Sequence, residues 1–403
     1  MPRLARLFIA LSAVTFAATT QAQPPNTAAK ASVTLPAPVA PDKDYFLFVV
    51  SESADQLALV KYGPNGLSLV REHKVGMMPT EINGPHGLSV SPDGKWYYIS
   101  IAHGTPYGTF WKYSTENDSI AGRATLGNFP ATVQTTPDGA LAFIVNFNLH
   151  GEMVPSSVSV VSTDEMVEIA RITTCTMPHG SRVNKAGTQQ YSACMMDDAL
   201  VEIDTRALEV SRHFMLGKGK EMGMSGPPAA MQHEGHAGAM SHDSATVAMP
   251  AVQCSPTWAQ PSASGDRIFV ACNKSSEIVE IDFKTWQMTR RWGAGEGVYN
   301  LAVSPDGKML LATNKRGKSV SVFDIATTKE LARIPTLKGV VHGVVVSPDS
   351  SYAFVTEEGR GSEAGILEVF NLAAMKSVAT LGLGQQTAGI DFFRTAPPSP
   401  ASR

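Results

Sequence analysis

The chain has 403 residues, a formal net charge of −3 and 43% hydrophobic residues. A chain of this length and composition can bury a large core, and it lacks the excess of basic residues typical of nucleic-acid-binding or membrane-surface proteins. We therefore expect no nucleic-acid partner, and partners among metal ions, small molecules or other proteins.

Residues 1–22 have the pattern of a cleaved signal peptide. Arg3 and Arg6 supply its positive charge, Leu7–Ala18 form its apolar region, and small residues ending at Ala22 form a cleavage site. The apolar run is too short to cross a bilayer, and no other long apolar segment follows it. We expect a monomeric protein without a membrane span, exported to the periplasm or secreted.

The segments near the two ends of the chain have compositions that cannot build a core. Residues 23–42 are rich in Pro and Ala and predict an extended leader, whereas residues 394–403 predict a disordered tail. Between them, residues 43–393 suffice for one large all-β domain.

One short pattern recurs through this domain, a Pro-Asp-Gly turn followed by a strand. The turn occurs at Pro92–Gly94, Pro137–Gly139 and Pro305–Gly307, and in altered form at Lys185–Gly187, Ala263–Gly265 and Pro348–Ser350. Proline presets φ at the start of such a turn, and glycine supplies the positive φ at its end. A period of roughly 40–45 residues with four short strands is typical of a β-propeller blade.

Counting the strands predicts a seven-bladed β-propeller. Six full repeats begin near residues 84, 129, 177, 255, 297 and 340. Three strands precede them, at Tyr45–Ser51, Gln56–Lys61 and Ser68–Arg71, and one strand follows them, at Thr387–Phe392. We expect these four strands to form a mixed closing blade, because closure of the ring removes exposed sheet edges.

The four cysteines occupy two equivalent places in the repeat. Cys194 and Cys272 end second strands, and Cys175 and Cys254 each stand a few residues before an inner strand. In an antiparallel pair, the start of one strand lies beside the end of the other. In an oxidising compartment this predicts the disulfides Cys175–Cys194 and Cys254–Cys272. Pairing between blades and thiolate metal ligands remain as alternatives.

Three histidines share one position, the start of an inner strand. They are His86, His179 and His342, and each is followed by glycine. Inner strands begin at the mouth of the central channel, so three imidazoles there predict a metal or cofactor site. Tyr299 holds the same position in another blade, and His103 and His150 fall in loops of the same face. The alternative is that the repeat copied a histidine that only caps a strand.

One interval between turns is longer than the others by about 35 residues. This insert, residues 215–253, has no strand pattern from Met215 to Met249 and predicts a long polar loop over the histidine face. It contains the candidate metal ligands Met222, Met224, Met231, His233, His236, Met240 and His242. Thioethers with imidazoles suit Cu(I), and an exposed loop has no packing need for so many methionines. The alternative is a low-complexity insertion that binds nothing.

No catalytic motif accompanies these residues. The sequence lacks Cys-x-x-Cys-His, Gly-x-Ser-x-Gly, His-Glu-x-x-His and a phosphate-binding glycine loop. We therefore predict no catalytic residue, and whether the protein is an enzyme stays open.

The repeats resemble the YVTN family of seven-bladed propellers, most clearly at Ser304–Gly307 with Thr313 and Asn314, and at Phe143–Asn146. The resemblance covers about residues 44–393 and implies the fold. That superfamily is similar to the propellers of periplasmic nitrite reductase, which holds a d-type haem, and of nitrous oxide reductase, where histidines hold copper. The similarity implies a haem- or copper-binding role for the three channel-mouth histidines. The insert resembles Met/His-rich segments of copper-handling proteins.

The sequence as a whole predicts a periplasmic propeller that binds a metal, preferentially copper, or a small ligand at its histidine-lined mouth. One alternative is a redox or tetrapyrrole-handling protein with haem in the channel mouth. Another is a scaffold without a cofactor that binds another periplasmic protein.

Overall fold

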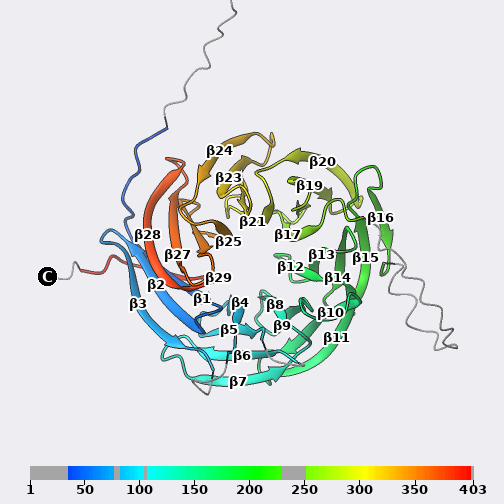
Figure 1. Ribbon diagram of the computed structural model, residues 1–403, viewed down its shortest axis with the longest axis horizontal. Helices are drawn as coiled ribbons and strands as arrows, with labels where there is room; N and C mark the ends of the chain where they lie inside the picture. Colours follow the sequence, from blue (N-terminus) through cyan, green and yellow to red (C-terminus); the bar gives the residue numbers. More distant parts are fainter. Residues whose placement is uncertain (1–34, 77–81, 104–106, 229–250, 401–403) are drawn as a thin grey trace, which may run out of the picture. The chain divides into compact units, whose positions relative to one another are not determined.

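The computed structural model describes residues 35–76, 82–103, 107–228 and 251–400. This part of the chain consists of β-strands without helices, arranged as seven antiparallel sheets around a central axis (Figure 1). It includes no helix that could cross a membrane. The predicted seven-bladed β-propeller is confirmed.

We number the sheets as blades in chain order and give their strands from the axis outward. Blade one contains β29 (Thr387–Ala396), β1 (Asp44–Ser51), β2 (Gln56–Gly63) and β3 (Gly66–Lys74). Blade two contains β4 (Pro85–Val90), β5 (Trp96–Ile101), β6 (Thr109–Ser114) and β7 (Ile120–Thr125). Blade three contains β8 (Pro130–Thr135), β9 (Leu141–Asn146), β10 (Pro155–Ser162) and β11 (Val167–Thr176).

The remaining four blades follow the same order. Blade four contains β12 (Pro178–Val183), β13 (Gln189–Cys194), β14 (Ala199–Asp204), β15 (Glu209–Met215) and β16 (Met222–Ser225). Blade five contains β17 (Pro256–Pro261), β18 (Arg267–Cys272), β19 (Glu277–Asp282) and β20 (Gln287–Gly293). Blade six contains β21 (Val298–Val303), β22 (Met309–Asn314), β23 (Ser319–Asp324) and β24 (Glu330–Pro335). Blade seven contains β25 (Val340–Val346), β26 (Tyr352–Glu358), β27 (Ala364–Asn371) and β28 (Lys376–Gln385).

The ring closes as predicted, by pairing the two ends of the domain. β29 is antiparallel to β1, with Leu47 opposite Phe392 and Val49 opposite Ile390. This pairing places β29 at the axis, inside the three N-terminal strands (Figure 1). Each inner strand therefore has a neighbour on both sides of the ring.

The repeated turns have the backbone that their sequence requires. Gly94, Gly139 and Gly307 have φ values of 71°, 74° and 74°, a left-handed conformation that costs glycine little. Ser350 adopts φ 58° at the same place in blade seven. The side chain of Asp306 accepts hydrogen bonds from Ser304 Oγ at 2.6 Å and from the Lys308 backbone N–H at 3.1 Å, which fixes the turn.

The hydrophobic core lies between adjacent blades rather than within one sheet. Phe48 on β1 packs against Tyr97 on β5, with ring centroids 4.5 Å apart, and the same cluster contains Leu57, Ile99 and Trp111. Burying each such side chain contributes about 1.5–3 kcal/mol. Packing of blade against blade holds the inner strands, and hence the channel mouth, in fixed positions.

Both predicted disulfides are confirmed. Cys175 bonds Cys194 with a Cα–Cα distance of 5.8 Å, and Cys254 bonds Cys272 with a Cα–Cα distance of 4.5 Å. Each bridge joins the approach to an inner strand to the end of the second strand of the same blade, as the repeat register predicted.

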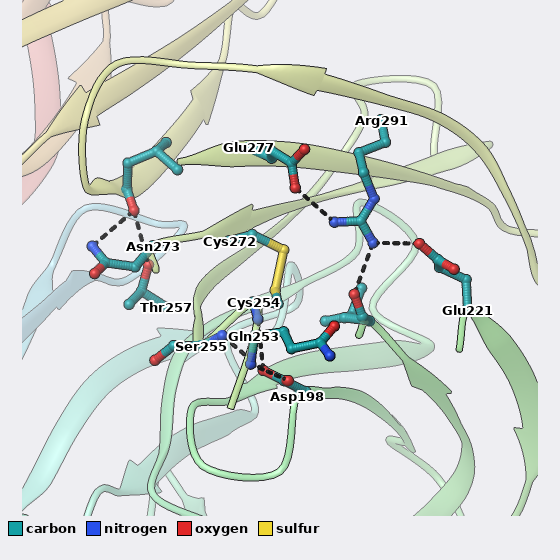
Figure 2. The surroundings of a disulfide bond; sticks show 12 residues. Asp198, Glu221, Gln253, Cys254, Ser255, Thr257, Cys272, Asn273, Glu277 and Arg291 are labelled. Carbon is teal, nitrogen blue, oxygen red and sulfur yellow. Dashed lines mark hydrogen bonds and ion pairs between the residues drawn. A yellow bond between two sulfur atoms is a disulfide. The ribbon is translucent and has the colours of Figure 1, made fainter. Parts of the chain in front are cut away.

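The second disulfide stands where the chain returns from the insert (Figure 2). There the carboxylate of Asp198 accepts hydrogen bonds from three successive backbone N–H groups, those of Gln253, Cys254 and Ser255. On the outgoing side, Arg291 pairs with Glu221 at 2.8 Å. Both ends of the insert are therefore fixed to blades four and five.

Two boundaries differ from the sequence-based expectation. The insert is not free of strands, because Met222–Ser225 pair with β15 as a fifth strand at the outer edge of blade four (Figure 1). The predicted tail begins too early, because β29 continues to Ala396 and Ser399 donates its backbone N–H to Asp44 at 2.9 Å. Backbone hydrogen bonds to β15 form the strand Met222–Ser225, and backbone pairing with β1 extends β29 beyond the expected Thr387–Phe392. The predicted signal peptide lies outside the described residues.

Candidate functional site at the mouth of the central channel

His86, His179 and His342 lie together at the channel mouth, although they come from blades two, four and seven. The ring centroid of His86 lies 6.4 Å from that of His179 and 5.6 Å from that of His342. All three side chains contribute to one cavity. The three rings therefore point inward, as the shared repeat position predicted.

The glycine that follows each histidine has a packing reason. A Cβ at Gly87 would overlap the carbonyl oxygen of Ala131 on the next inner strand. A Cβ at Gly180 would likewise overlap the carbonyl oxygen of Thr257, and one at Gly343 would lie 2.7 Å from that of Ala388. Neighbouring inner strands approach too closely here for any side chain, so glycine at this place allows the histidines to converge.

Glu52 connects two of the histidines through its carboxylate. Its Oε2 lies 2.6 Å from His86 Nδ1, and its Oε1 lies 2.7 Å from His103 Nε2. Burial would raise the pKa of Glu52, but the charge of His86 and the hydrogen bonds from both histidines lower it to about 2. The hydrogen bond to Glu52 in turn raises the pKa of His103. Glu52 therefore stays ionised at neutral pH.

Tyr299 lies between the other two histidines. Its hydroxyl is 3.0 Å from His179 Nε2 and 3.4 Å from His342 Nε2. His179 Nδ1 lies 3.1 Å from the carbonyl oxygen of Thr257, which can only accept, so Nδ1 carries the proton and Nε2 accepts from Tyr299. Burial raises the pKa of Tyr299, so its hydroxyl remains protonated.

The imidazoles of His179 and His342 are neutral. They are 2% and 6% exposed, and burial lowers the pKa of His179 to about 3 and that of His342 well below its usual value. The positive charge of the nearby Lys315 lowers both pKa values further. A neutral imidazole keeps a lone pair for a metal ion or a hydrogen-bond donor.

A second carboxylate completes the polar ring at the mouth. Glu358 Oε1 lies 3.5 Å from Lys315 Nζ and 3.8 Å from His342 Nε2. Burial raises the pKa of Glu358. The ammonium of Lys315 also lies 4.3 Å from the ring centre of Tyr299.

Sequence reasoning missed Glu52, Lys315 and Glu358, although a signal for them was present. Glu52 directly follows β1, Lys315 directly follows β22 and Glu358 ends β26, each a second strand of its blade. The ends of second strands lie beside the starts of inner strands, where the three histidines stand. His103 was found because it is a histidine in such a loop.

The remaining predicted site residues have different locations. His150 packs against Phe129, with ring centroids 5.7 Å apart. Met222 and Met224 lie on β16, four strands away from β12, which at about 4.8 Å per strand is roughly 19 Å from the histidine position. The structure therefore does not bring these two methionines to the histidines. Met231, His233, His236, Met240 and His242 lie outside the described residues.

A small cavity lies on the axis next to the three imidazoles. Its volume is about 40 Å³, and its lining also includes Arg182, Trp258 and Asn300. Two imidazoles bound to one ion, at nitrogen–metal distances of about 2.0–2.1 Å, place their ring centres roughly 5–6.5 Å apart. The two ring separations measured from His86 fall in that range. As they stand, however, no three His, Cys, Asp or Glu side chains of the described residues form a metal site.

The fold and this site define the class as a seven-bladed β-propeller with a polar, histidine-lined channel mouth. No protein-family model matches the chain, and no curated protein matches it. Among solved structures, the chain is similar to a periplasmic gluconolactonase from Pseudomonas aeruginosa, at 15% identity and a TM-score of 0.64, covering 88% of this chain and 100% of that one.

Two further structures show the same fold. A candidate 6-phosphogluconolactonase from Bacteroides fragilis matches at 13% identity and a TM-score of 0.63, covering 88% of this chain and 99% of that one. Hydrazine synthase from Kuenenia stuttgartiensis matches at 17% identity and a TM-score of 0.58, covering 78% and 92%. At these identities the likeness shows the propeller fold alone.

Proposed function

We propose that the protein is an exported propeller that binds a copper ion at His86, His179 and His342. The observation that supports this proposal is the convergence of imidazoles from three different blades, with the rings of His179 and His342 centred 6.4 Å and 5.6 Å from that of His86. His179 and His342 are neutral at pH 7, so a metal ion need not compete with a proton for their nitrogens. Imidazole suits copper and zinc, and copper lies highest in the usual order of affinity.

Binding requires only a local change at the mouth. The Nε2 atoms of His179 and His342 both face the Tyr299 hydroxyl, whose single proton is donated to His179, so the metal must displace this hydroxyl. His86 is already oriented by Glu52 through Nδ1, which leaves Nε2 for the metal. A carboxylate that holds the other nitrogen of a ligating histidine is a common support of metal sites.

The two disulfides support export to the periplasm or secretion, because such bonds persist in oxidising compartments. The haem alternative uses the same histidines, but a cavity of about 40 Å³ is far smaller than a tetrapyrrole. Two of the similar structures are named as lactonases, but this chain shares only their fold, so we do not assign it a lactonase activity.

Copper titration of the untagged, metal-depleted protein tests the proposal. We expect the wild type to bind one copper ion that survives deletion of residues 229–250 and is lost when the three histidines are replaced together by asparagine. His73→Gln is the matched control, because His73 is a half-buried histidine beside Asp118 and Tyr113, away from the mouth. Equal copper binding by the triple variant and the wild type would reject the site in favour of the scaffold alternative. A Soret band in protein purified from cells would instead favour haem.

A further inference from the structure

Arg182 is a half-buried cation with no carboxylate at ion-pair distance among the described residues. It lies on the inner strand β12, three residues after His179, and its guanidinium carbon lies 4.5 Å from the ring centre of Trp258. Burial lowers its pKa to about 10, so it remains charged at neutral pH. Among the described residues, no carboxylate lies within ion-pair distance of it, and its one hydrogen bond is from Nη1 to the carbonyl oxygen of Ser181, at 2.9 Å.

The carboxylate whose charge acts on Arg182 is that of Asp391, and both of its oxygens already accept hydrogen bonds from the backbone. Its Oδ2 accepts from the backbone N–H of Val90 at 2.7 Å, and its Oδ1 accepts from the backbone N–H of Phe392 at 2.9 Å. Asp391 acts on Arg182 only by its charge at longer range. A guanidinium has five N–H donors, and even partial burial of such a charge costs free energy where its donors lack partners. A further acceptor near Arg182 would remove that cost.

The cavity beside Arg182 has the space and the polar lining for such an acceptor. Trp258, Asn300 and His342 line it and are 5%, 3% and 6% exposed. Trp258 and Asn300 each have a buried polar atom without a hydrogen-bond partner, namely Trp258 Nε1 and Asn300 Oδ1. Trp258 Nε1 can only donate, and the Asn300 amide can present its NH₂ group after a rotation of 180°. Native proteins rarely leave several such atoms together unsatisfied.

We propose that this axial cavity binds one small monovalent inorganic or carboxylate anion, held by Arg182 and by the N–H of Trp258. The cavity volume of about 40 Å³ admits an ion of a few atoms and excludes a sugar or a nucleotide. The anion supplies the negative charge that Arg182 lacks and the acceptor that Trp258 lacks. The site stands on these contacts alone and does not require copper at the histidines above it.

Bromide is the probe for this site, because its anomalous scattering identifies it in a crystal. Crystals of metal-free wild-type protein soaked in bromide are expected to show one anomalous peak in the cavity, within hydrogen-bond distance of Arg182 and Trp258. In solution, bromide and formate are expected to raise the melting temperature at constant ionic strength. A cavity that holds only water, with no anomalous peak, would overturn the proposal.

Variants separate recognition from folding. Arg182→Gln is expected to weaken bromide binding at least 10-fold. Arg182→Lys keeps the positive charge and is expected to retain most of the bromide affinity. Trp258→Phe keeps the ring but removes the N–H, and is expected to weaken binding about 5-fold, the loss of one hydrogen bond of about 1 kcal/mol. If Arg182→Gln does not fold, the bromide affinity of Trp258→Phe and the anomalous peak in wild-type crystals still test whether the cavity binds an anion. Unchanged affinity in Trp258→Phe, or a peak elsewhere on the axis, would reject the assigned contacts.

Discussion

Glu52 Oε2 lies 2.6 Å from His86 Nδ1, which joins blade one to blade two at the channel mouth. The same carboxylate accepts from His103, so one acidic side chain orients two imidazoles. Glu52 is 2% exposed. This arrangement makes the stability of the mouth dependent on pH.

Glu52→Gln is expected to destabilise the protein most between about pH 4.5 and 6.5. Because the pKa of Glu52 is lowered to about 2, its stabilising effect is complete above its ordinary value and is lost as the pH falls towards 2. The pKa of His103 is raised, so protonated His103 stabilises the folded protein fully below about pH 6.5. This stabilisation is lost as the pH rises through the raised pKa. We expect a loss of about 2 kcal/mol at pH 5.5, as for hydrogen bonds to a charged group, and a smaller loss at pH 9.

Denaturant unfolding at several pH values measures this loss. Glu72→Gln, a change at an exposed position on β3, is the matched control and is expected to leave the profile unchanged. A loss for Glu52→Gln that is equal at pH 5.5 and pH 9 would contradict the ion-pair explanation.

Tyr299→Phe is expected to strengthen copper binding. The Tyr299 hydroxyl occupies the Nε2 atoms of His179 and His342, and copper must displace it. The one hydrogen bond that need not be broken is worth about 1 kcal/mol, so the affinity should rise about 5-fold. Titration against a competing chelator measures the change. A weaker affinity would show that Tyr299 itself binds the metal, against the expectation from its raised pKa.

Replacing Cys254 and Cys272 together by serine is expected to lower the free energy of unfolding by about 3 kcal/mol. The bridge closes a loop with a sequence separation of 18, and a crosslink restricts the unfolded chain. Urea unfolding without reductant measures the loss, and the Cys175, Cys194 double variant serves for comparison. Titration of the denatured, unreduced wild type should find no free thiol. Two reactive thiols per chain would show that one of the two disulfides is absent.

Gly389→Ala is expected to destabilise the closure of the ring by about 1–3 kcal/mol. A Cβ at Gly389, on β29, would overlap the carbonyl oxygen of His86 on the neighbouring inner strand. Gly382 on β28 is the matched control, because a Cβ there would meet no atom within 4 Å. Thermal unfolding compares the two variants. Equal melting temperatures would show that the inner strands can separate without cost.

The sequence determined those features that local patterns and the repeat register specify. Turn residues such as those at Gly94 and strand alternation define each blade, and the unequal strand counts at the two ends define the closure through β29. The register alone placed Cys175 beside Cys194, and it placed His86, His179 and His342 at one end of the channel. These features were predictable because each depends on a position within a repeat that occurs many times.

Only the tertiary structure decided which side chains at the channel mouth bond to one another and which residues line the axial cavity. The contacts of Glu52 with His86, and of Tyr299 with His179, join side chains that are distant in the sequence, and their geometry depends on how closely neighbouring blades pack. The lack of an ion-pair partner for Arg182 among the described residues could not be predicted from the sequence, because it depends on which side chains of other blades pack around the guanidinium. β16 was missed for a similar reason: its four residues are held by backbone hydrogen bonds to β15, and backbone pairing leaves no mark in the side chains.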